Sequence, residues 1–127
     1  MTMVLVVDDV KPMAEQYAYD LARVGGYETA TADGGAAALE RLARDAVDCV
    51  VLDLEMPGMD GFAVLRALMK KGIETPVIVY TGTGSYERCV QAVRLAAYGF
   101  VAQAEPMERE VQAIEAAIER RRLLLEV

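Results

Sequence analysis

Residues 49–53, Cys-Val-Val-Leu-Asp, form an apolar run that ends on a carboxylate, and the turn-forming stretch Leu-Glu-Met-Pro-Gly-Met-Asp-Gly follows at residues 54–61. A short, almost continuously apolar run bounded by Gly and Pro is typical of a strand that is covered on both faces. Similar runs recur along the chain. The expected strands are Met3–Val7, Glu28–Ala32, Cys49–Leu54, Pro76–Thr81 and Gly99–Gln103.

The segments between these strands have the apolar spacing of amphipathic helices. Apolar side chains recur every three or four positions, as at Leu39, Leu42 and Ala43, and Gly-containing breaks separate the segments. Alternating strands and helices predict a parallel sheet with helices on both faces, joined by right-handed connections. We therefore expect an α/β, flavodoxin-like (βα)₅ fold with strand order 2-1-3-4-5.

The length and composition predict one globular domain over residues 1–127. Apolar residues make up 54% of the 127 residues, and the net charge is −7. This charge argues against direct binding of nucleic acid or of an anionic membrane, and favours a partner with a basic face. The chain has no histidine. This absence excludes catalysis by a Ser-His-Asp triad or a Cys-His pair within the chain. It also excludes histidine metal ligation and a histidine phosphodonor.

The cysteines and the first residues of the chain bear on its compartment. Cys49 and Cys89 do not form a C-x-x-C pair, so we expect buried thiols in a reducing cytosol. The first residues lack a basic segment, and no run approaches the roughly 18 apolar residues of a membrane span. The sequence therefore predicts a cytoplasmic protein without a membrane segment.

Carboxylates follow two strands that are neighbours in the expected sheet. Asp8 and Asp9 follow the first strand, and Asp53 ends the third. Two carboxylates about 4 Å apart repel by about 4 kcal/mol at an effective dielectric constant of 20, so the cluster must hold protons or recruit a cation. Oxygen ligands favour Mg²⁺, and Mn²⁺ could substitute. Alternatively, Asp8 and Asp9 cap the next helix, as we expect Asp60 to cap the third helix.

Hydroxyl and backbone N–H groups follow the fourth strand. Thr81 precedes Gly82-Thr83-Gly84, and such groups bind phosphate. No Gly-Lys-Ser/Thr follows, so this is not a Walker A loop, and an ordinary turn is the alternative. Together with the acidic cluster, Thr81 favours phosphoryl transfer to a carboxylate, with Asp53 as the acceptor.

Nearly the whole chain resembles the receiver domain of two-component response regulators. The resemblance rests on three motifs, which are Val6-Val-Asp-Asp9, Asp53-Leu-Glu-Met-Pro-Gly-Met-Asp-Gly61 and Tyr80-Thr-Gly82. It implies that Asp53 receives a phosphoryl group from a histidine kinase or a histidine phosphotransfer protein. Such a protein is a signalling module rather than an enzyme acting on other substrates.

The resemblance also implies a role for each site residue. Asp9 and Asp53 would bind Mg²⁺ directly, Asp8 through water and Glu55 through its backbone carbonyl. Thr81 would move to hydrogen-bond the phosphoryl group. The aromatic residue that moves with this threonine in the family corresponds to Phe100, for which a plain core position is the alternative. For the Glu55 side chain, the alternatives are an inward-pointing acid and a solvated loop acid.

The sequence departs from the family pattern after the fifth strand. Receivers usually have Lys-Pro there, whereas this chain has Gln103-Ala104, and sliding the alignment to Glu105-Pro106 does not restore a lysine. A charge-assisted contact is worth about 1.5–3 kcal/mol, against roughly 0.5–1.5 for a neutral one. Replacing the lysine contact by the glutamine contact loses about 1–2 kcal/mol, which corresponds to a factor of roughly 5–30 in an equilibrium constant or a rate. We expect Asp53 to remain modifiable, with weaker or rewired coupling to the distal face.

The resemblance implies an output surface for a downstream protein on the fourth helix, fifth strand and fifth helix. Its aromatic and basic residues are Tyr86, Arg88, Arg94 and Tyr98. The run Arg120–Arg122 is favourable charge at a helix C-terminus. The tail Leu123–Val127 is either a homodimer contact or the start of a helix leading to an output domain.

Two other functions remain open from the sequence. A receiver-like interaction module could act without phosphorylation. A phosphatase of the haloacid dehalogenase type also uses an aspartyl nucleophile and Mg²⁺, and Glu55 lies at the spacing of its second acid, but the chain lacks the later basic residue and a cap domain.

Overall fold

The computed structural model describes residues 1–56, 60–82, 86–94, 97–103 and 105–126, without the side chains of residues 86, 88, 89 and 93. Several sequence expectations therefore lie outside the described residues. They concern Pro57-Gly58, Thr83-Gly84, Ala104, Val127 and the side chains of Tyr86, Arg88 and Cys89.

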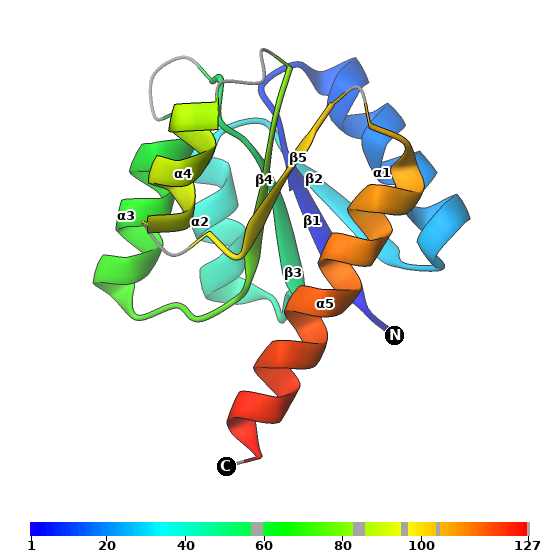
Figure 1. Cartoon of the computed structure of the whole chain (residues 1–127). Coiled ribbons are helices and arrows are strands. Elements are labelled where there is room, and N and C mark those ends of the chain that lie inside the picture. The colour runs from blue at the N-terminus through cyan, green and yellow to red at the C-terminus, as the bar shows by residue number, and fades with distance from the viewer. Residues whose placement is uncertain (57–59, 83–85, 95–96, 104, 127) are drawn as a thin grey trace.

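Strands and helices alternate along the described chain (Figure 1). The strands are β1 (Met3–Val7), β2 (Glu28–Ala32), β3 (Cys49–Asp53), β4 (Val77–Thr81) and β5 (Gly99–Ala102). The helices are α1 (Lys11–Gly25), α2 (Gly35–Arg44), α3 (Gly61–Lys71), α4 (Tyr86–Arg94) and α5 (Met107–Leu125).

The strands form one parallel sheet in the order β2-β1-β3-β4-β5, which confirms the predicted flavodoxin-like topology. Three predicted boundaries are wrong by one residue, because β3 ends before Leu54, β4 begins after Pro76 and β5 ends before Gln103. Pro76 has no N–H to donate to a strand ladder, although its carbonyl accepts from Val50.

Each face of the sheet is covered by its own helices, as the sequence predicts. Helices α1 and α5 cover one face, and α2, α3 and α4 cover the other (Figure 1). Alternate strand residues point to opposite faces. Accordingly, Val4 and Val6 pack with α1 and α5, whereas Leu5 and Val7 pack on the opposite side. Cys49 is a buried thiol within the first of these layers.

Helix α3 is capped at both ends, and its first residue packs closely against the end of β3. The Asp60 side chain accepts a 2.9 Å hydrogen bond from the Ala63 N–H, which confirms the predicted N-cap. Gly61 has no side chain, and a Cβ there would lie 2.8 Å from the carbonyl oxygen of Asp53 and from Cα of Leu54. Gly72 ends the helix at φ 70°, in the left-handed region.

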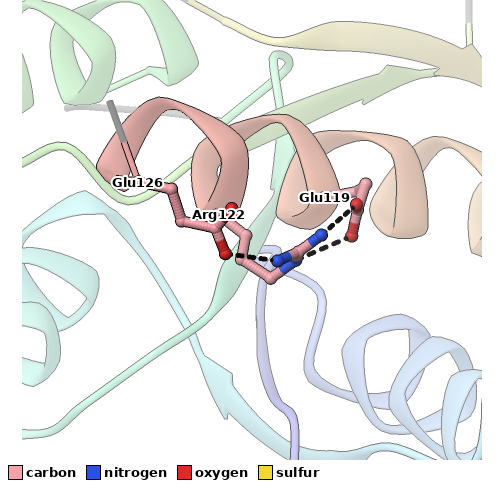
Figure 2. Close-up of polar contacts among 3 residues, drawn as sticks. All are labelled: Glu119, Arg122 and Glu126. Atoms are coloured by element: carbon pink, nitrogen blue, oxygen red, sulfur yellow. Dashed lines mark hydrogen bonds and ion pairs between the residues drawn. The ribbon is translucent and has the colours of Figure 1, made fainter.

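The three arginines near the end of α5 differ in their contacts. Arg122 pairs with Glu119 and Glu126, at 2.6 and 2.5 Å, one on each side along the helix (Figure 2). Arg121 donates to the backbone carbonyl of Glu74, and the Arg120 guanidinium lies 5.3 Å from the centre of the Tyr98 ring. Arg122 lies in the last turn, where positive charge favours the helix. None of the described helices is both long and apolar enough to cross a membrane.

Candidate functional site

The register of the sheet brings residues from three strands to one edge. Val6 of β1 lies opposite Val51 of β3, and Asp53 lies opposite Tyr80 of β4. Because side chains alternate along a strand, Asp8 and Asp53, each two residues further on, share the face that α1 and α5 cover. Carboxylates from neighbouring strands therefore meet at the carboxyl edge of the sheet.

The three acidic residues form one cluster, as predicted. One carboxylate oxygen each from Asp8, Asp9 and Asp53 lies within 4.8 Å of the others. Asp8 is 2% exposed, Asp53 is also buried, and Asp9 is half-buried. They line an open pocket of about 290 Å³. Its other described lining residues are Val10, Met13, Glu55, Gly82 and Gln103.

Both oxygens of Asp8 accept hydrogen bonds from the protein. The Tyr80 hydroxyl donates to Oδ2 at 2.5 Å, and the backbone N–H of Val10 donates to Oδ1 at 2.9 Å. The alternative that Asp8 or Asp9 caps α1 is wrong, because the N-cap of α1 is Val10, which makes no side-chain capping bond. A carboxylate has about four lone-pair sites, so Asp8 can still face a cation or its water.

The environment of Asp53 disfavours a free negative charge. Burial raises the pKa of Asp53 to about 6, and the charges of the neighbouring acids act in the same direction. The backbone N–H of Glu55 donates to Oδ1 of Asp53 at 2.9 Å and lowers this pKa in part. An all-oxygen cluster with uncompensated negative charge fits a hard divalent cation such as Mg²⁺. The carboxylates of Asp8, Asp9 and Asp53 are the groups that could hold it. The water-mediated role of Asp8 and the contribution of the Glu55 carbonyl stay predictions.

Glu55 and Gln103 lie at the mouth of the pocket. The Glu55 side chain is exposed yet lines the pocket, so it is a solvent-facing acid beside the cluster. The backbone N–H of Gln103 donates to the carbonyl of Thr81 at 3.2 Å. The side-chain Oε1 of Gln103 lies over Gly82, at 2.7 Å from the position that a Cβ on Gly82 would occupy. Among the described lining residues none carries a positive charge, and the lining includes the neutral Gln103.

Two predicted site residues lie outside the described pocket lining. Thr81 ends β4 and is buried, and its neighbour Gly82 lines the pocket instead. Phe100 on β5 is 42% exposed, so the alternative of a plain core aromatic is wrong. Phe100 belongs to β5, which is an edge strand of the sheet. Its role as a switch stays a prediction.

Sequence reasoning missed a set of buried polar side chains behind the acidic cluster. The Tyr80 ring stacks on that of Tyr17 at 4.8 Å between centres and 12° between planes. The Tyr17 hydroxyl then donates to Glu110 of α5 at 2.9 Å. Burial, followed by the interactions with Asp8, raises the pKa of Tyr80, so its hydroxyl keeps its proton and donates. A tyrosine inside an apolar strand was the available signal, because a buried hydroxyl needs a partner.

The fold and this acidic edge define an α/β domain with a candidate cation site, and sequence comparison identifies its family. Residues 4–115 match the response regulator receiver domain. The chain belongs to this family, and it is a signalling module of the receiver type. This family assignment replaces the haloacid dehalogenase alternative.

Individual relatives agree with this assignment. The chain is 34% identical over 123 residues to the C4-dicarboxylate transport transcriptional regulatory protein DctD of Rhizobium meliloti (strain 1021). It is 35% identical over 120 residues to the transcriptional regulatory protein KdpE of Mycobacterium tuberculosis (strain ATCC 25618 / H37Rv). These matches cover 97% and 94% of this chain, but only 26% of DctD and 52% of KdpE.

A solved structure gives the same result for the fold. The receiver domain of NtrX from Brucella abortus has a TM-score of 0.84 to this chain at 34% identity. The match covers 91% of this chain and 98% of that one. The similarity therefore extends over a whole receiver domain.

Proposed function

We propose that the chain accepts a phosphoryl group on Asp53 from a phosphohistidine of a histidine kinase or a histidine phosphotransfer protein. The observation that carries the proposal is the convergence of Asp8, Asp9 and Asp53 within 4.8 Å at the carboxyl edge of the sheet. Asp53 is the central candidate, because its strand lies between β1 and β4 and its carboxylate opens into the pocket.

The proposed transfer balances as a simple displacement. An oxygen of the Asp53 carboxylate forms the new bond to phosphorus, and the bond from phosphorus to the donor imidazole nitrogen breaks. The imidazole leaves with the electron pair and takes up a proton from water. When bound, Mg²⁺ or Mn²⁺ would neutralise charge on the phosphoryl oxygens and on the acidic cluster.

The remaining proposed site residues support or report this step. Thr81 donates its hydroxyl to a phosphoryl oxygen, and Gln103 supplies a neutral amide contact in place of the usual lysine. Phe100 changes its packing when Thr81 moves. The output partner is a protein that binds the face formed by α4, β5 and α5.

The described part of this face agrees with a protein-binding surface in chemical character. Arg94 is exposed, and Tyr98 is half-buried beneath Arg120. Homodimer formation through the exposed residues Leu123–Leu125 stays part of the proposal.

Intact-mass spectrometry tests the acceptor. Incubation with acetyl phosphate and Mg²⁺ is expected to add one phosphoryl group, and Asp53→Asn is expected to abolish the adduct. The exposed Asp48→Asn is a matched control that keeps it.

Absence of the adduct in the wild-type protein at saturating acetyl phosphate would contradict the proposal. It would favour the second candidate function, a receiver-like interaction module that acts without phosphorylation. The neutral Gln103 at the site mouth is the observation that favours this second candidate.

A further inference from the structure

Tyr80 reaches the acidic cluster from a neighbouring strand. It lies in β4, its side chain is fully buried, and its hydroxyl donates to Oδ2 of Asp8, 72 residues away in sequence. β3 lies between β1 and β4, so the tyrosine side chain spans the width of a strand to make this bond.

The position of the Tyr80 ring is restrained on its other side. It stacks nearly parallel on the Tyr17 ring of α1, so the restraint comes from the Tyr17 ring rather than from its hydroxyl. Moving the Tyr80 hydroxyl away from Asp8 would disturb this stacked pair. The donor is therefore preorganised before any ligand enters the site.

The negative charges around Asp8 explain why a hydrogen-bond donor at this position matters. Three carboxylates converge in a pocket whose described lining contains no cation, and Gln103 is neutral. Without the Tyr80 donor, Asp8 would keep only the bond from the Val10 N–H, and repulsion from the neighbouring carboxylates would favour turning its side chain outward. A hydrogen bond to a charged acceptor is stronger than one between neutral groups, and a buried donor that holds a ligand fixes its orientation.

We propose that Tyr80 is a positioning residue of the acidic site, holding Asp8 in the orientation in which the cluster of Asp8, Asp9 and Asp53 would hold a divalent cation. This inference rests on the metal-binding part of the proposed function. It goes beyond that function because it assigns to a residue of β4, outside the acidic cluster, control over the metal affinity of the site.

Isothermal titration of the metal-free protein with Mg²⁺ tests the inference. Tyr80→Phe keeps the ring and its stacking but removes the donor, and we expect the Kd for Mg²⁺ to rise roughly 10-fold. Tyr17→Phe is the matched control, because it removes a hydroxyl that contacts Glu110 rather than Asp8. Its Kd should stay near the wild-type value, as should that of the exposed Tyr19→Phe.

A readout in the metal-free protein separates orientation of Asp8 from general loss of packing. The ¹³Cγ resonance of Asp8 is expected to shift in Tyr80→Phe and to stay in place in Tyr17→Phe. This resonance reports the hydrogen bond directly, and it requires neither bound metal nor phosphorylation.

Several outcomes would overturn the inference. An unchanged or tighter Kd in Tyr80→Phe would do so, and so would an equal weakening in Tyr17→Phe, because the effect would then come from packing. Failure of the wild-type protein to bind Mg²⁺ would overturn this inference together with the metal-binding part of the proposed function. Mg²⁺ binding without an adduct on Asp53 would contradict only phosphoryl transfer, and the weaker Kd in Tyr80→Phe would then still support the role of Tyr80.

Discussion

The hydroxyl of Tyr17 on α1 donates a 2.9 Å hydrogen bond to Oε2 of Glu110 on α5, joining residues that are 93 positions apart. Glu110 is only 1% exposed, and its Oε1 has no hydrogen-bond partner in the described part of the chain. Burial raises the pKa of Glu110 to about 7, the bond from Tyr17 opposes this rise, and the charge of Glu105 adds to it. The contact between α1 and α5 therefore contains a carboxyl group that tends to keep its proton near neutral pH.

This contact predicts a pH dependence of folding stability. The folded-state pKa of about 7 lies above the ordinary value of 4.5, so the folded protein binds the proton more tightly. The stabilising contribution is complete below about pH 4.5 and is lost as the pH rises through about 7. The loss is on the order of 3 kcal/mol. Glu110→Gln is expected to remove it, so that the variant is more stable than wild type at pH 8.

Urea unfolding at pH 5 and pH 8 measures this difference. Glu108→Gln, an exposed position on the same helix, is the control and should leave the pH profile unchanged. Equal pH slopes for wild type and Glu110→Gln would show that the carboxyl group does not titrate as described.

The packing of α3 against β3 predicts a strong effect at Gly61. In Gly61→Ala the added Cβ would meet the backbone of Asp53 and Leu54 at 2.8 Å, so the helix or the strand end must shift. We expect a loss of about 1–3 kcal/mol in the free energy of unfolding. The shift should also weaken Mg²⁺ binding, because it displaces the backbone beside Asp53.

Gly34→Ala is the matched control for this prediction. A Cβ at Gly34 meets nothing within 4 Å, and its backbone is extended rather than left-handed. Chemical denaturation of both variants provides the comparison, and a Gly61→Ala protein as stable as Gly34→Ala would contradict the packing argument.

The neutral residue at the mouth of the site predicts a gain of function. Gln103→Lys places a positive charge beside the acidic cluster, where the contact to a phosphoryl group gains about 1–2 kcal/mol. The yield or lifetime of the Asp53 adduct should rise by roughly 5- to 30-fold. Intact-mass measurements over time compare the Asp53 adduct of Gln103→Lys with that of Gln112→Lys. Gln112 is an exposed site on α5, and its substitution makes the same charge change. A similar gain in both variants would point to net charge rather than to a local contact.

The exposure of Phe100 predicts a visible response to activation. Its ring is 42% exposed in this structure, and a switch linked to Thr81 would bury it further. NMR titration with Mg²⁺ and beryllofluoride, which mimics a phosphoryl group on Asp53, should shift the Phe100 ring resonances. Phe62, a buried residue of α3, is the internal comparison. Resonances of Phe100 that stay fixed while those of Asp53 move would show that the switch is uncoupled.

Much of the fold could be predicted from the sequence because its signals are local. Apolar runs such as Val4–Val7, with glycine-containing breaks between segments, mark strands and connections over a few residues. In a parallel sheet the strand ends share one edge, so the meeting of Asp8 and Asp53 also follows from their positions in the chain. The errors of one residue at Leu54, Pro76 and Gln103 all lie at strand boundaries, where a strand meets a connecting segment.

Only the tertiary structure decided which side chains surround that edge. The bond from Tyr80 to Asp8, the stack of Tyr80 on Tyr17 and the contact of Tyr17 with Glu110 each join elements far apart in sequence. The sequence by itself determined the strand order and the acidic edge, through periodicity and topology. Side-chain partners depend on how α1 and α5 pack across the sheet, and that packing is set by many distant contacts together rather than by any local pattern.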